Sequence, residues 1–231
     1  MLYSREQKES AFRFEHRRGI NFLLSGTHTI EQLTAGYWSV FFNIARHRRL
    51  SKLSDDAAKQ LIIRPVKDLL EYDPFAIEKI RFLTGDQPYL IQLICRSLIE
   101  HCNHLRKNYV TINDVNTVHN EVMETGSIHF KWIWEQTSPQ ERAVLSIMAQ
   151  EGGEEDRHLS LSDVEAICHD YGMSYERKTL GQALQKLVQA DIIEEIAEES
   201  RFRISVGLTR RWVRETKPLR KVIQEENLQA H

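Results

Sequence analysis

Hydroxyl side chains follow a short apolar run near the start of the chain. The run is INFLLSG, residues 20–26, which contains Ser25 and is followed directly by Thr27. A continuous apolar run of this length, bounded by glycine, predicts a buried parallel strand. At the carboxyl end of such a strand, a hydroxyl can donate to a phosphate oxygen or hold an attacking water. The same two residues would equally suit a polar turn after a buried strand.

Amide and basic side chains share one face of a helix that is predicted to begin at Ser174. A glutamine can pair bidentately with adenine, and arginines on the hairpin that follows could contact phosphates. A solvated helix face would show the same pattern. The candidate DNA-contacting residues are Lys178, Gln182, Gln185 and Lys186 on the helix and Arg201 and Arg203 on the hairpin.

The elements that would position the two hydroxyls form an α/β pattern over residues 1–65. After the strand, AGYWSVFFNIARHR places aromatic residues at helical spacing, which favours core packing over a cofactor site. Ser54 then opens a helix that Pro65 stops. This order of elements is typical of the end of an α/β domain.

Residues 66–126 are predicted to be entirely helical. One helix ends at Gly85 and the next begins at Pro88, because glycine favours the end of a helix and proline its first turn. Thr111 and Asp114 have the spacing of a capping box at the start of a third helix.

Residues 127–216 are predicted to form a separate module of three helices followed by a hairpin. Ser138 and Glu141 form a capping box at the first helix. In RFRISV, apolar residues alternate with polar ones, as in a strand with one buried face. This order is typical of a winged helix. The charged residues 217–231 are expected to be a flexible tail.

Composition limits the possible environments and partners. The 231 residues are 41% hydrophobic and 28% charged, as in a globular chain with a packed core. Three cysteines without a C-x-x-C, no secretory leader pattern and no apolar run near the ~20 residues of a membrane span predict a reduced, cytoplasmic chain. There is no zinc-binding spacing, H-E-x-x-H or G-x-S-x-G motif, so no metal site is expected.

Charge is distributed unevenly along the chain. The net charge is −2 with a pI near 6.6, which predicts no bulk attraction to nucleic acid or to an anionic membrane. Residues 1–129 carry 17 Lys/Arg against 15 Asp/Glu, whereas residues 130–216 carry 11 against 16. Since affinity for DNA depends mainly on neutralising phosphates, the acidic module disfavours DNA binding.

Four groups of segments occur in a fixed order along the chain: INFLLSGTH; LSDDAAKQLIIRP; LTGDQPYLIQLIC with VTINDV; and ERAVLSIMA, LGQALQKLVQADIIEE and RFRISVGLTRRWV. Together, over roughly residues 15–216, they resemble the C-terminal two-thirds of a STAND-type AAA+ ATPase. These signalling NTPases are related to archaeal ATPases and origin-recognition ATPases. The resemblance implies a mainly α fold with an α/β remnant: a partial P-loop NTPase core, an AAA+ helical lid and a C-terminal winged helix.

The resemblance also implies roles for individual residues. Ser25, with Thr27 as the alternative, matches the sensor-1 residue that monitors the γ-phosphate of ATP. Gly85 and Pro88 match a lid turn near the adenine, where Pro88 replaces the sensor-2 arginine of other AAA+ lids. Asp86 stands where the STAND pattern Gly-x-Pro has its glycine, which is a departure from the family. Gly85 and Pro88 would also be explained as a helix end and a helix start.

The motifs that grip phosphate and metal are missing. A P-loop needs a Gly-Lys pair, and none of the ten glycines is followed by lysine. A Walker-B acid needs an apolar strand before it, but Asp55 and Asp56 follow LSKLS and Asp191 precedes its apolar pair. ATP and Mg²⁺ are cofactors of the family, and no cofactor is expected for this chain alone. The sequence predicts that it does not hydrolyse ATP by itself.

We therefore expect the lid and winged-helix regulatory half of an ATP-binding signalling ATPase that acts as a nucleotide-dependent switch. Its expected partner is a nucleotide-binding core missing from this chain, or another protein, and an oligomer is compatible with the family. The alternatives are a winged-helix DNA-binding regulator and a protein-interaction scaffold. In STAND proteins the winged helix usually packs on the core as a switch element, which suits the acidic module.

Overall fold

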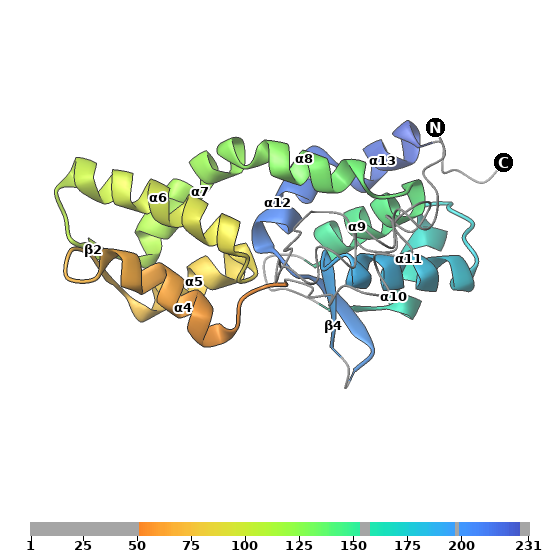
Figure 1. Ribbon diagram of the computed structural model, residues 1–231. Coiled ribbons are helices and arrows are strands. Elements are labelled where there is room, and N and C mark those ends of the chain that lie inside the picture. The colour runs from red at the N-terminus through yellow and green to blue at the C-terminus, as the bar shows by residue number, and fades with distance from the viewer. Residues whose placement is uncertain (1–50, 153–157, 197–198, 227–231) are drawn as a thin grey trace, which may run out of the picture. The chain divides into compact units, whose positions relative to one another are not determined.

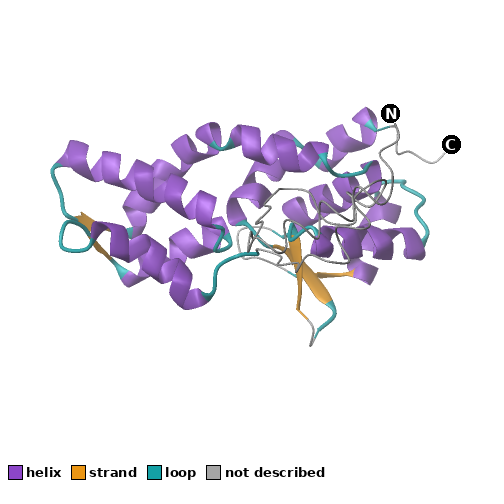
Figure 2. Ribbon diagram, in the orientation of Figure 1, coloured by secondary structure: helices purple, strands orange, loops and turns teal. Residues whose placement is uncertain are grey.

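Helices make up most of the part of the chain that the structure describes. The computed structural model describes residues 51–152, 158–196 and 199–226 (Figure 1). Within these ranges the predicted mainly α class is confirmed, and the strands form only two small sheets (Figure 2). The predicted strand at 20–26, with Ser25 and Thr27, lies outside the described residues. Every described helix is too short or too polar to span a bilayer.

Four helices of the first half pack into a bundle, which we call the helical bundle. Each helix has a start signal in the sequence: Ser54 accepts a hydrogen bond from a backbone amide of the first turn, two prolines occupy first-turn positions, and Thr111 and Asp114 form the predicted capping box. The helices are α4 (Asp55–Ile63), α5 (Pro74–Thr84), α6 (Pro88–Leu105) and α7 (Ile112–Thr125).

Short elements connect these helices. A 3₁₀ turn (Arg64–Val66) follows α4. Strand β1 (Glu71–Tyr72) pairs in parallel with β2 (Tyr109–Val110), which joins the starts of α5 and α7. Helix α4 packs against both α5 and α6. It therefore lies with the bundle, although the boundary expected at residue 65 grouped it with the preceding residues.

The second half forms a C-terminal module around α9, in which three helices precede the predicted hairpin. Strands β4 and β5 pair antiparallel with Glu194 opposite Arg203, and β3 pairs with the other edge of β5, so the sheet order is β3-β5-β4. The elements are α9 (Pro139–Glu151), β3 (Leu159–Ser160), α10 (Leu161–Asp170), α11 (Arg177–Gln189), β4 (Ile193–Ile196), β5 (Arg201–Ile204) and α12 (Gly207–Thr216).

Two helices differ from expectation. Helix α8 (Ser127–Glu135) is additional to the three helices predicted before the hairpin. It follows α7 after one residue and packs against α7 and α12. The flexible tail expected at 217–231 is wrong for α13 (Leu219–Glu225), which packs on α9. Its apolar residues at helical spacing explain this, because Leu219, Val222 and Ile223 are buried.

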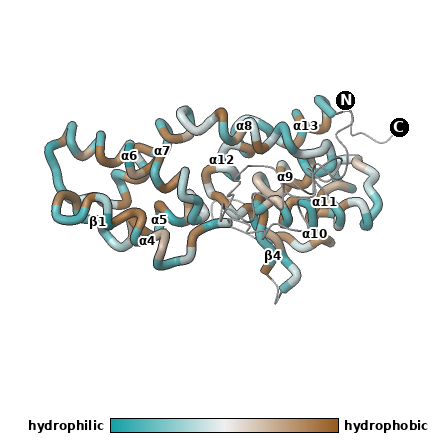
Figure 3. The backbone as a smooth tube through the Cα atoms, viewed as in Figure 1, coloured by the Kyte–Doolittle hydropathy of each residue, from teal (hydrophilic) through white to brown (hydrophobic). Residues whose placement is uncertain are grey.

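One continuous set of buried apolar side chains runs through both halves. Hydrophobic and hydrophilic residues alternate along the helices (Figure 3), and the hydrophobic ones include the fully buried Ile91 and Leu98 of α6 and Ile147 of α9. The bundle and the module are thus packed against each other. The chain from Ser51 onward behaves as one compact unit.

Candidate functional site

The structure brings one of the two predicted nucleotide-proximal lid residues to a cavity. Gly85 ends α5 in the left-handed conformation (φ 57°), and Asp86 after it also has a positive φ of 58°. Both line the cavity, whereas Pro88 starts α6 and is not part of its wall. The predicted helix end at Gly85 and helix start at Pro88 are confirmed.

Two glycines allow the backbones of the bundle and the module to touch. A Cβ atom at Gly85 would lie 2.4 Å from the carbonyl oxygen of Ser205. A Cβ at Gly207, the first residue of α12, would lie 2.9 Å from the carbonyl oxygen of Phe82 and 3.2 Å from Cα of Leu83. We call this double contact between the end of α5 and the β5–α12 connection the junction. Any side chain there would force the two backbones apart.

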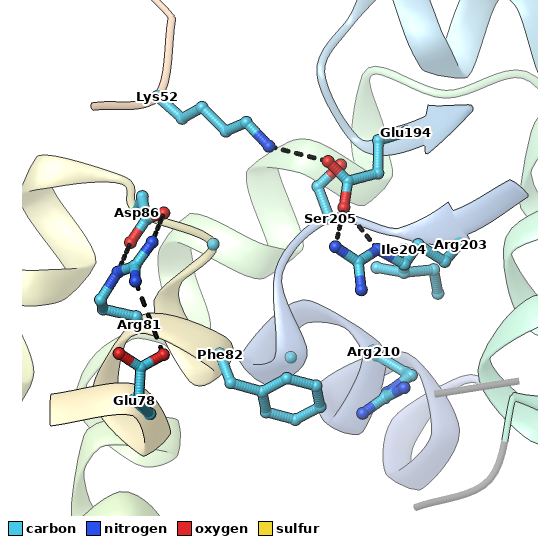
Figure 4. Close-up of a pocket in the computed structure, with 12 residues that line it drawn as sticks. Lys52, Glu78, Arg81, Phe82, Asp86, Glu194, Arg203, Ile204, Ser205 and Arg210 are labelled. Carbon is cyan, nitrogen blue, oxygen red and sulfur yellow. Dashed lines mark hydrogen bonds and ion pairs between the residues drawn. The ribbon is translucent and has the colours of Figure 1, made fainter. Parts of the chain in front are cut away.

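A polar cavity of about 230 Å³ opens beside the junction. Figure 4 shows its labelled side chains: the α5 residues and Asp86 stand on one side, and the hairpin residues face them. Its charged lining residues are Lys52, Glu78, Arg81, Asp86, Glu194, Arg203 and Arg210.

On the bundle side, Arg81 is surrounded by carboxylates. Its Nε and Nη2 donate to the two oxygens of Asp86 at 2.9 and 3.0 Å, which is a bidentate pair. It also forms ion pairs with Asp55 and, at 3.5 Å, with Glu78. The hydrogen bonds to Asp86 raise the pKa of Arg81 and outweigh the opposing effect of burial. This pair fixes the turn that carries Gly85.

On the module side, Glu194 accepts from two cations. Lys52 Nζ donates to its Oε2 at 2.7 Å, and Arg203, its cross-strand neighbour, donates to Oε1 (Figure 4). Burial raises the pKa of the Glu194 carboxyl, but the hydrogen bonds from Lys52 and Arg203 outweigh it, so the pKa is lower than usual. Glu194 is therefore ionised at neutral pH and holds both cations.

Cation–π and aromatic contacts connect α12 to α5 and to α8. The guanidinium of Arg210, which is buried, lies 5.2 Å from the centre of the Phe82 ring. Farther along α12, the Trp212 ring lies 6.3 Å from the rings of both Phe130 and Trp134 of α8. Helix α12 thus contacts α5 at its first turn and α8 farther along.

Three of the four cationic side chains that line the cavity, Lys52, Arg81 and Arg203, already pair with carboxylates. A phosphate needs donors that carboxylates do not already occupy, but Arg81 is held by Asp86 and its neighbours, and Glu194 holds Lys52 and Arg203. The open side of Gly85 is filled by the Ser205 carbonyl instead of a ligand. Among the described residues, no group of three or more His, Cys, Asp or Glu could hold a metal ion.

The candidate DNA-contacting residues separate into two sets. On α11 the four predicted residues are exposed, and Lys186 lies 3.8 Å from Glu141. On the hairpin, Arg203 is bound to Glu194, and Arg201 is paired with Glu199 at 3.6 Å and donates to the His158 carbonyl. The structure therefore leaves the helix face open and engages both hairpin arginines with the protein. The α11 residues are Lys178, Gln182, Gln185 and Lys186.

A second charged cluster in the bundle has a structural explanation. Asp114 accepts from Lys107 Nζ, from the Thr111 hydroxyl at 2.7 Å and from the Thr111 amide at 2.8 Å, and His101 Nε2 lies 3.1 Å away. Burial raises the pKa of Asp114, but the hydrogen bonds from Lys107 and Thr111 outweigh it and hold the pKa well below its usual range. The group caps α7 and ties it to the end of α6.

Sequence reasoning missed most of the cavity wall. Lys52, Arg81 and Glu194 carry no motif, because their partners lie up to 142 positions away. Gly207 offered a signal, because a glycine next to the predicted strand RFRISV can mark a place where another backbone approaches closely.

Comparisons of the chain with protein-family models, with curated proteins and with solved structures found no match. Its interpretation therefore rests on the residues and their geometry.

Proposed function

We propose that the described residues act as the lid and winged-helix regulatory half of a STAND/AAA+-like signalling ATPase. In this proposal the helical bundle is the lid and the C-terminal module is the winged helix. ATP and Mg²⁺ would be bound by a nucleotide-binding core, which a further polypeptide or partner supplies, with Ser25 as its sensor. When that core exchanges ATP for ADP, the bundle would shift and the junction would pass this shift to the module.

One observation carries the proposal. The turn around Gly85, which the resemblance associates with nucleotide, is the same turn that touches the β5–α12 connection. A shift of this turn would act on the module directly, since Gly85 and Ser205 have no space between them. The element order of the module, three helices with a β3-β5-β4 sheet, supports the winged-helix interpretation.

The first test reads the coding sequence immediately upstream of Met1. The proposal expects a G-x-x-x-x-G-K-[ST] loop and an apolar strand ending in Asp-Asp or Asp-Glu, in or near frame. Titration of the present chain with labelled ATP should show no binding tighter than millimolar. An upstream region without both motifs would contradict a core encoded together with this chain, and micromolar ATP binding by this chain alone would contradict the proposal itself.

The second test addresses the switch in the protein that joins both parts. Trp134 of α8 contacts Trp212 of α12, the helix that begins at the junction, so their fluorescence should change when ATP replaces ADP. At saturating ATP, Gly85→Ala should abolish the fluorescence change, because its Cβ would wedge the junction open. Gly172→Ala is the matched control: Gly172 also has a positive φ, but a Cβ there meets nothing within 4 Å. Loss of the response in both variants would contradict the assigned role of the junction.

A DNA-binding regulator is the second candidate, and the exposed face of α11 favours it. Glutamine and lysine side chains on a third helix are suited to a major groove. The acidic balance of residues 130–216 and the engaged hairpin arginines oppose it.

A gel shift on random duplex DNA at 50 and 200 mM salt distinguishes the two functions. A DNA-binding regulator should bind with a dissociation constant of about 1–100 μM and lose affinity steeply at the higher salt. Lys178→Ala should then weaken binding, and Lys131→Ala, on α8, should not. The switch proposal expects no shift at either salt concentration.

A further inference from the structure

The segment that enters the described part of the chain is attached to both halves of the molecule. The amide of Leu53 donates to the carbonyl of Asp86 at 2.9 Å, which ties the segment to the bundle. The neighbouring Lys52 reaches the other way and donates to Glu194 of β4 at 2.7 Å. In Figure 4, Lys52 extends across the top of the cavity toward Glu194.

The carboxylate that receives Lys52 is held firmly in place. Glu194 is shared with Arg203, and its side chain is 27% exposed, compared with 51% for Lys52. Partial burial makes its charge more sensitive to the loss of a partner than that of a fully solvated carboxylate. Arg203 is in turn paired with Glu194 across the hairpin, so a pull on Glu194 acts on both strands.

We propose that Lys52 and Glu194 form a clasp that couples the chain entering at Ser51 to the β4–β5 hairpin. The hydrogen bond of the Leu53 amide and the ion pair of Lys52 are made by adjacent residues. A displacement that breaks one of these contacts therefore weakens the other. A movement of residues 51–53 thus reaches the bundle turn at Asp86 and the module hairpin at the same time. This clasp goes beyond the proposed function and does not depend on it, since it requires no nucleotide.

Hydrogen exchange of single amides in the full chain tests the clasp. The two reporters are the Leu53 amide, bonded to Asp86, and the Ser205 amide, bonded to the Ile192 carbonyl at 3.0 Å. Glu194→Gln should speed exchange at Leu53 about two- to fivefold, although the substitution lies in a different half of the molecule. Lys52→Met should speed exchange at Ser205 by a similar factor.

Further variants separate the clasp from general destabilisation. In Lys52→Met/Glu194→Gln, exchange at Leu53 should be no faster than in the more affected single variant, because both remove the same ion pair. Lys52→Arg keeps the charge and should exchange like the wild type. Lys131→Met, which removes an ion pair within α8, should leave Leu53 unchanged.

The amide of Leu98, in the core of α6, should keep its exchange rate in every variant. The clasp is overturned if Glu194→Gln leaves Leu53 unchanged, if the two single effects multiply in the double variant, or if Leu98 accelerates by the same factor as Leu53.

Discussion

The junction between α5 and α12 can be tested by giving Gly85 a side chain. In Gly85→Ala the new methyl carbon would lie 2.4 Å from the Ser205 carbonyl oxygen and 3.0 Å from Cγ2 of Val206. The nearest obstacle is backbone, which cannot rotate away as a flexible side chain can. The substitution also places alanine at φ 57°, where L-residues are strained.

The magnitude follows from these two separate costs. The left-handed conformation of alanine costs about 1–2 kcal/mol. Forcing an extra methyl group into a packed contact adds about 1–3 kcal/mol. We therefore expect Gly85→Ala to lower the free energy of unfolding by about 2–5 kcal/mol.

Three other glycines separate the two costs. Gly172→Ala has the positive φ without a contact and should cost about 1–2 kcal/mol. Gly207→Ala has the backbone contact without a positive φ and should cost about 1–3 kcal/mol. Gly181→Ala, inside α11 with 3.9 Å to Leu161, has neither and should stabilise by about 0.5–1 kcal/mol.

Urea unfolding followed by tryptophan fluorescence measures all four variants. Near-UV circular dichroism should also change in Gly85→Ala and Gly207→Ala, because Trp212 lies on the helix that must move. The same loss of stability in Gly85→Ala and Gly172→Ala would mean that the Ser205 carbonyl yields freely. That result, with a neutral Gly207→Ala, would refute a tightly packed junction.

The capping group, the last helix and the cysteines give further predictions. Asp114→Asn should lower the free energy of unfolding by about 1–2 kcal/mol at pH 7, measured by urea unfolding. Because the folded pKa of Asp114 is lowered, the stability that its carboxylate contributes is complete above about pH 4 and is lost as the pH falls toward that lowered value. The stability of the variant should therefore depend less steeply on pH below pH 4. Leu219→Ala should cost about 2–5 kcal/mol by the same assay, whereas removal of a flexible tail residue would cost nothing. Burial raises the pKa of Cys95 and of Cys168 to about 11. A thiol reagent at pH 8 should therefore label both at least about 100-fold more slowly in the native chain than in urea. Rapid labelling of the native chain would contradict their burial.

Local signals in the sequence predicted local structure well. The capping boxes at Thr111 and Ser138 join residues three positions apart, so the sequence alone contains both partners. The helix end at Gly85 is likewise a property of one position. The start of α11 was predicted three residues too early, at Ser174: Tyr175 packs against the core from the segment before the helix, and packing overrode the local signal.

Elements that are stabilised by distant parts of the chain could not be predicted in this way. Strand β3 has only two residues, Leu159 and Ser160, and forms because β5 offers a free edge. Helix α13 was mistaken for a tail because its charged residues hid a short apolar stripe. In both cases the partner that stabilises the element lies elsewhere in the fold, and no pattern within the element itself reports it.

The net charge of the module and the ion pairs of its individual side chains give different information about function. The count alone predicted that an acidic module would repel DNA, which leaves open whether the hairpin arginines could still reach phosphates. In the fold, Arg203 pairs with Glu194, and Arg201 pairs with Glu199 and donates to the His158 carbonyl. DNA would have to break these contacts before it gained any of its own. At the junction, by contrast, Gly85 and Ser205 are already in contact, so a small shift of either residue would displace the other.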